Sequence, residues 1–92
     1  MIKVNEYFDG NVKSLGFEVS GTPYTVGVIM AGAYTFNTEK TEHLQIVAGE
    51  LDIKPAAGAW QKLKKGDLTV IPAGISFDLK LKDPAAYICA YT

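Results

Sequence analysis

Glu42 is the side chain of this sequence best suited to chemistry. It ends the polar stretch NTEKTE and opens the apolar run EHLQIVAG. Its carboxylate is either an exposed group at the start of a strand or a buried group that accepts hydrogen bonds from the hydroxyls of a sugar. Because a buried carboxylate without a partner is costly, the second interpretation requires a donor from the ligand or from a neighbouring hydroxyl such as Tyr34 or Thr38.

Aromatic side chains offer a second kind of chemistry, the stacking of a ligand ring. Tyr34, Phe36 and Phe77 are by residue type candidates for the core. They are also candidates for stacking on a nucleobase, which contributes about 1 to 3 kcal/mol for any base because every base has a π face. Tyr91, near the C-terminus, either adds a hydroxyl to such a pocket or packs in the core or a dimer interface.

Neither a metal centre nor a thiol nucleophile is indicated. His43 is the only histidine, whereas imidazole-based metal sites take several ligands that converge on one face. We therefore expect no metal and no other cofactor. Cys89, the single cysteine, is expected to be a small buried side chain, since a reactive thiolate needs a stabilising neighbour and no histidine shares its motif.

The charge composition excludes several classes of partner. A formal net charge of −1 gives no broad attraction to DNA, RNA or anionic lipid. The basic residues are all lysine, so an anion such as phosphate must be held by lysine, hydroxyls or backbone N–H groups. No run approaches the roughly 20 apolar residues of a membrane span, and the first ten residues lack the apolar core of a secretory signal. We expect a cytoplasmic protein.

The elements that must position these residues are strands. The apolar residues fall in short blocks separated by nine Gly and four Pro, without a capped amphipathic helix. We expect one all-β domain over residues 1–92, a sandwich or closed barrel. The expected strands are residues 4–8, 12–20, 24–36, 42–49, 50–54, 59–65, 67–73, 76–81 and 85–92.

Alternation within these strands predicts which side chains face inward. In ISFDLKL, Phe77 shares a face with Ile75 and two leucines, opposite a face of Ser, Asp and Lys, which is typical of a half-buried antiparallel strand. In EHLQIVAG, Glu42 and His43 point to opposite faces. They serve one pocket only if a bulge intervenes.

Two segments resemble the sequence motifs of the cupin β-barrels. GDLTVIPAG has Gly and Pro at the spacing of the second motif, and EHLQIVAGEL has Glu42 seven residues before Gly49, as in the first. The histidines of a metal-binding cupin are missing. Their positions fall on Phe36 and Thr38, or on Thr35 and Asn37, and the last one on Phe77. The resemblance implies a cupin-type barrel, or jelly roll, with an apolar, stacking pocket in place of a metal site.

The whole chain is also similar to a narrower family, the small one-domain pyrimidine/purine nucleoside phosphorylases with a cupin fold. The similarity runs through NEYFDGNVKSLGF, VGVIMAGAYTFNT, IVAGEL, FDL and YICAYT. It implies metal-free phosphorolysis of purine and pyrimidine nucleosides to free base and α-D-ribose 1-phosphate, by a homodimer. Ala90 departs from the pattern at a place where at least one member of the family carries a basic residue. If that residue holds phosphate there, this chain must hold phosphate differently.

The resulting hypothesis assigns a role to each candidate residue. Phe36 and Phe77 stack the base, and Glu42 binds the ribose hydroxyls as the catalytic residue. Further substrate-binding contacts are assigned to the side chains of Tyr34, Thr38 and Tyr91. Three alternatives stay open: a non-catalytic cupin module that binds a sugar or nucleoside, a metal-dependent cupin oxygenase or isomerase, and a purely structural dimer module.

Overall fold

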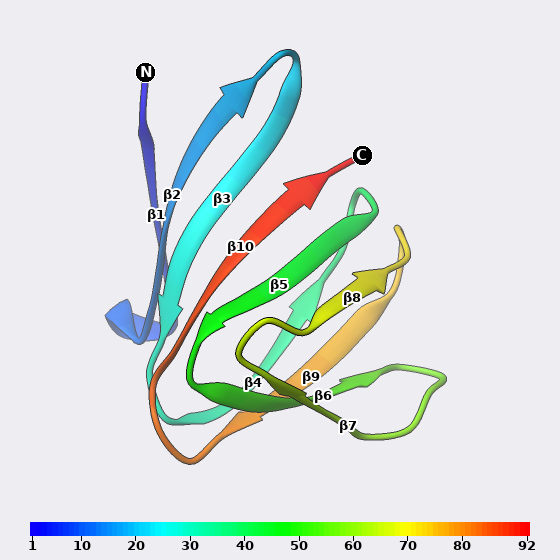
Figure 1. The fold of residues 1–92 in the computed structure, drawn as a ribbon. Coiled ribbons are helices and arrows are strands. Elements are labelled where there is room, and N and C mark those ends of the chain that lie inside the picture. Colours follow the sequence, from blue (N-terminus) through cyan, green and yellow to red (C-terminus); the bar gives the residue numbers. More distant parts are fainter.

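The structure, a computed structural model, describes all residues 1–92 and is built almost entirely of strands (Figure 1). One short 3₁₀ helix, η1 (Phe8–Gly10), interrupts them. The strands are β1 (Lys3–Tyr7), β2 (Val12–Val19), β3 (Thr22–Ile29), β4 (Gly32–Asn37), β5 (Glu42–Ala48), β6 (Glu50–Pro55), β7 (Gln61–Lys64), β8 (Leu68–Ile71), β9 (Ser76–Leu81) and β10 (Ala85–Tyr91). The all-β prediction is confirmed.

The strands form two antiparallel sheets that face one another. One has six strands in the order β1-β2-β3-β10-β5-β8, and the other has four in the order β4-β9-β6-β7. No ladder joins the two sheets, so the fold is a cupin-type jelly roll made of two layers rather than a continuous barrel. No helix in the structure has the length and apolar character needed to cross a membrane.

One expected strand is wrong. Residues 24–36 are not a single strand but two, β3 and β4, which belong to different sheets. The chain crosses between the layers at Met30 and Ala31, and β4 begins at Gly32 with φ 149°, a conformation that L side chains rarely adopt. The chain thus crosses between the layers at Met30 to Gly32, although the residues around them have the pattern of one continuous strand.

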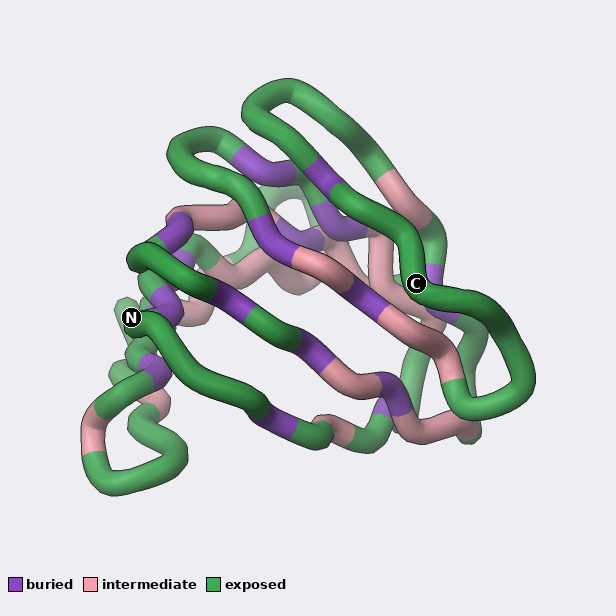
Figure 2. The backbone as a smooth tube through the Cα atoms, turned by 90° about the horizontal axis from the view of Figure 1, so that it is seen from below, coloured by how far each residue is buried: buried purple, intermediate pink, exposed green.

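The core lies between the sheets and follows the predicted alternation. Phe77 and Leu79 of β9 are buried, whereas Lys80 is exposed. On β5, Leu44 and Ile46 are buried. Figure 2 shows this alternation as short buried segments between exposed ones along the strands. The inward direction predicted for Phe77 is therefore confirmed.

Candidate active site

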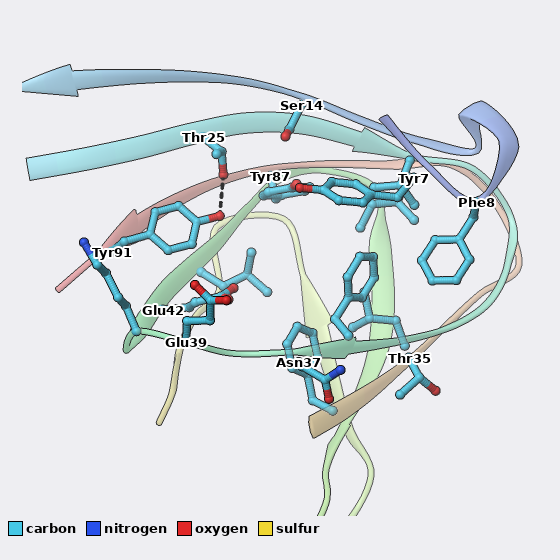
Figure 3. Close-up of a pocket in the computed structure, with 17 residues that line it drawn as sticks. Tyr7, Phe8, Ser14, Thr25, Thr35, Asn37, Glu39, Glu42, Tyr87 and Tyr91 are labelled. Carbon is cyan, nitrogen blue, oxygen red and sulfur yellow. Dashed lines mark hydrogen bonds between the residues drawn. The ribbon is translucent and has the colours of Figure 1, made fainter. Parts of the chain in front are cut away.

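A cavity of about 620 Å³ opens between the two sheets (Figure 3). This volume lies in the usual range for small-molecule sites. Its lining includes side chains from both layers and from the segment that joins β1 to β2. Two groups of lining residues differ in chemistry, and we call them the polar wall and the aromatic wall.

The polar wall is formed by five side chains on the inner face of the six-stranded sheet. Pairing places them together, because β2, β3, β10 and β5 are consecutive in that sheet. The hydroxyls of two of them, Thr25 and Tyr91, are 2.9 Å apart and share a hydrogen bond (Figure 3). The wall consists of Ser14, Thr25, Glu42, Tyr87 and Tyr91.

Gly27 makes room for one of these side chains. It pairs with Tyr87 across the ladder of β3 and β10, and a Cβ atom at Gly27 would lie 2.5 Å from Cζ of the Tyr87 ring. Real Cβ atoms do not approach so closely, so the ring can lie flat over the strand only because residue 27 has no side chain. Burial raises the pKa of the Tyr87 hydroxyl, and the neighbouring Ser14 and Thr25 hydroxyls oppose this shift.

Glu42 lies at the start of β5, half-buried in the cavity lining. Burial raises the pKa of its carboxyl group above the usual value, and a hydrogen bond from Cys89 opposes this shift. The Cys89 Sγ donates to Oε1 over 3.7 Å. Neither ion pair of the structure includes Glu42, so a ligand hydroxyl would meet a carboxylate that no cation neutralises.

Cys89 itself has the character of a buried, protonated thiol. It is 1% exposed. Burial and the nearby charge of Glu42 raise the pKa of the thiol to about 12. A thiol of this kind does not ionise near neutral pH, so it donates to Glu42 and is not a nucleophile.

The aromatic wall consists of Phe36 and Phe77 on the four-stranded sheet, with Tyr7 and Phe8 from the end of β1 and from η1. Phe36 on β4 pairs with Phe77 on β9, and their rings stack with centroids 5.7 Å apart and planes at 22°. Phe8 and Tyr7 meet the Phe36 ring edge-on, at 5.3 and 6.1 Å. The Phe36 and Phe77 rings are in direct contact, so a base cannot insert between them.

Phe8 reaches the cavity in an unusual backbone conformation. Its φ is 53° and that of Asp9 is 56°. Non-glycine residues adopt this left-handed region at a cost of roughly 1 to 2 kcal/mol each. Such strain often marks binding sites, and here it orients the Phe8 ring against Phe36 and Tyr34.

The profile of the family described as pyrimidine/purine nucleoside phosphorylase matches residues 2–91 of the chain. The chain belongs to this family. It is 45% identical over 92 residues to the pyrimidine/purine nucleoside phosphorylase of Pseudomonas aeruginosa, with 99% of each chain covered. A relative of the same name from Aeromonas hydrophila is 47% identical, with 99% of this chain and 98% of the other covered.

Solved structures agree on the fold. A Vibrio parahaemolyticus protein of unknown function superposes with a TM-score of 0.96 at 41% identity, over 100% of this chain and 99% of the other. A putative ethanolamine utilisation protein from Salmonella typhimurium has a TM-score of 0.79 at 18% identity, covering 97% and 77%. At that identity the likeness concerns the fold alone.

The structure brings together four of the six residues that the sequence pointed to. Glu42, Phe36, Phe77 and Tyr91 all line the cavity. The other two do not, because their hydroxyls bind backbone. The Tyr34 hydroxyl donates to the Met30 carbonyl over 2.8 Å, and the Thr38 hydroxyl donates to the Pro72 carbonyl over 2.7 Å.

Tyr34 and Thr38 therefore make structural contacts to the backbone of this fold. Tyr34 braces the crossover from β3 to β4, and its ring packs against Phe8. Thr38 ties the end of β4 to the segment after β8, since its hydroxyl also accepts from the Ile75 N–H. We omit both from the proposed substrate contacts.

His43 points away from the cavity, as the alternation on β5 predicted. It is absent from the lining and its Nε2 lies 3.0 Å from the Thr92 hydroxyl. No three His, Cys, Asp or Glu side chains come together in the geometry of a metal site.

Sequence reasoning missed several lining residues. Tyr7 and Phe8 were expected to lie on a strand, and their place against Phe36 depends on the turn through η1. Ser14 and Thr25 are small hydroxyl residues in strands, which are common outside binding sites. A usable signal was the alternation of Tyr87 and Tyr91 on one face of the last strand.

Proposed function

We propose that the protein is a nucleoside phosphorylase of broad specificity, which uses phosphate to cleave purine and pyrimidine nucleosides to free base and α-D-ribose 1-phosphate. The names of its relatives support this activity. The observation that carries the proposal is the cavity with one aromatic and one polar wall, because a nucleoside also has one aromatic and one hydroxylated half.

The base is assigned to the aromatic wall. Phe36 lines the cavity and is partly exposed, whereas Phe77 beside it is 5% exposed and stacks on the Phe36 ring. Stacking on Phe36 takes any base, since it reads no hydrogen-bonding edge. This contact accounts for activity towards purines and pyrimidines alike.

The ribose is assigned to the polar wall. The Glu42 carboxylate accepts hydrogen bonds from the ribose diol, and the hydroxyls of Thr25 and Tyr91 give further polar contacts beside it. Hydrogen bonds to a charged acceptor are the stronger kind, and the partly dry cavity strengthens them further.

The reaction is a displacement at the anomeric carbon. A phosphate oxygen forms a bond to C1′ while the bond from C1′ to the base nitrogen breaks, and the base leaves with that electron pair and takes up a proton. Positive charge develops on the sugar in an oxocarbenium-like transition state. The negative carboxylate of Glu42 stabilises this charge, and the walls hold the two reactants in line.

Phosphate is the co-substrate in this scheme, and no metal or other cofactor takes part. The test is incubation of the protein with uridine and adenosine, with and without inorganic phosphate, followed by chromatography of free base and sugar phosphate. We expect base and ribose 1-phosphate only when phosphate is present. Base release independent of phosphate would make the protein a hydrolase. Binding without turnover would favour the non-catalytic module.

A homodimer in the cytoplasm completes the proposal. A domain of 92 residues buries a smaller fraction of its surface than a larger domain does, and association compensates for this. β1 stands at the edge of the six-stranded sheet, and Val4 on it is 68% exposed. An exposed edge strand of this kind pairs readily with a second copy. Light scattering at micromolar concentration should give twice 9.9 kDa, and a monomer mass would contradict this part.

A further inference from the structure

The cavity has an imbalance of charge that a phosphate reaction must overcome. Two carboxylates line it, those of Glu39 and Glu42, whereas Lys40 is the only cationic residue of the lining. A phosphate dianion is repelled by both carboxylates, and the repulsion is stronger in a cavity partly closed to water. The chain has no arginine to offset it.

Lys40 is placed to act as the missing counter-charge. It lies in the connection between β4 and β5, two residues before Glu42. The side chain is exposed, and neither ion pair of the structure includes it. Its ammonium group is therefore free to bind an anion without first leaving a carboxylate partner.

The connection that carries Lys40 lies at the polar end of the cavity. Glu39 and Glu42, the lining residues on either side of Lys40 in the chain, both lie near Tyr91 (Figure 3). Tyr91 pairs with Glu42 across the ladder of β10 and β5. Phe8 and the aromatic wall lie towards the other end. An anion held here approaches the sugar from the side away from the base, as an in-line displacement requires.

We propose that Lys40 binds the attacking phosphate at the mouth of the cavity, and that the adjacent Glu39 weakens this binding. The inference rests on the proposed function and adds the residue that holds the second substrate. A lysine binds phosphate as a point charge, without the fixed geometry of an arginine pair. The Lys40 ammonium thus attracts the phosphate, while the Thr25 and Tyr91 hydroxyls remain assigned to the ribose.

Lys40 and Glu39 carry opposite charges, so neutralising each of them should change the KM for phosphate in opposite directions. Lys40→Gln should raise the KM for phosphate about tenfold and leave the KM for uridine nearly unchanged, because one charge-assisted contact to phosphate is lost. Glu39→Gln should lower the KM for phosphate, because a repelling charge is removed. Lys40→Arg should restore most of the affinity. If this connection had only a structural role, Lys40→Gln and Glu39→Gln would not change the KM for phosphate in opposite directions.

Lys65→Gln is the matched control, since Lys65 is exposed and outside the cavity lining. An equal rise in the phosphate KM for Lys65→Gln, or no rise for Lys40→Gln, would overturn the inference. Calorimetric titration with inorganic phosphate separates it from the proposed function. The Lys40 site is supported if the wild-type protein binds phosphate more tightly than Lys40→Gln does, even if no nucleoside is cleaved. Equal binding, or no binding to wild type, refutes it.

Discussion

The two walls of the cavity are built by different means. The rings of the aromatic wall pack on one another, since Tyr7, Phe8 and Phe77 all contact the ring of Phe36, which stays partly exposed. The polar wall is open, because its Thr25 and Tyr91 hydroxyls share one hydrogen bond and keep further capacity for a ligand. The aromatic surface is thus formed before any ligand arrives, whereas the polar surface gains partners on binding.

Residue size explains where each wall lies. On the six-stranded sheet, small residues such as Ser14, Thr25 and Gly27 face inward and leave space beside the tyrosines. On the four-stranded sheet, phenyl rings at positions 36 and 77 fill the space. The phenyl rings thus keep the two layers apart, and the small residues of the polar wall leave the space that forms the cavity. We expect the base to contact the aromatic wall and the ribose to contact the polar wall.

The largest effect should come from the polar wall. Glu42→Gln keeps the shape of the side chain but loses charge-assisted hydrogen bonds of roughly 1.5 to 3 kcal/mol. We expect kcat/KM for adenosine and uridine to fall together by about 10- to 100-fold. Full activity in a folded Glu42→Gln protein would show that the carboxylate is only a surface group at the start of a strand.

The same variant should behave differently in unfolding. Burial raises the pKa of Glu42 in the folded protein, so the folded state holds the proton more tightly than the unfolded state does. The carboxyl group's contribution to stability is present at acid pH and is lost as pH rises through the folded pKa. Glu42→Gln has no ionisable group at this position, so it does not lose stability in this way as pH rises. Its melting temperature at pH 7 should equal or exceed that of wild type, and the difference should vanish near pH 4, as measured by calorimetry.

The next effect should come from the aromatic wall, and its two central rings should be separable. Phe36→Leu loses the exposed stacking surface, so we expect the KM for adenosine and uridine to rise together by about tenfold. Phe77→Leu should also weaken binding of both, but less, with a loss of about 1 kcal/mol in the free energy of unfolding. Steady-state kinetics and thermal unfolding of both variants give the comparison. A greater KM effect at position 77 would mean that Phe77 is the ring that meets the base.

A smaller effect should follow from crowding the polar wall. Gly27→Ala places a methyl group 2.5 Å from the Tyr87 ring, which must then swing away from the strand. We expect kcat/KM to fall about threefold by misplacement of the ring. Gly16→Ala is the control, because its Cβ meets no atom closer than 3.7 Å. Equal activities of the two variants would show that the place of Tyr87 does not matter.

No effect is expected from removing metals. No histidine lines the cavity and no three His, Cys, Asp or Glu side chains come together, so dialysis against a strong chelator should leave kcat/KM unchanged. A large loss that zinc, iron or manganese restores would overturn the metal-free proposal and would require ligands other than an imidazole cluster.

The site could be predicted in part because alternation along a strand is a local property. It placed Phe77 on an inward face and put Glu42 and His43 on opposite faces of their strand, and the structure agrees. Tyr34 shows the limit of this reasoning. It also faces inward, at 8% exposure, but its hydroxyl is used by the Met30 carbonyl. Burial alone does not distinguish a side chain in the core from one in a cavity.

By itself the sequence determined that the chain is all-β and which side chains alternate inward, since a period of two is encoded within each strand. The tertiary structure decided that β3 and β4 separate into different sheets, that Tyr7 and Phe8 meet Phe36, and that Lys40 lies on the cavity. The reason is physical. These contacts join segments far apart in sequence or follow a sharp change of chain direction, and they depend on how strands pair across two layers, which no local pattern specifies.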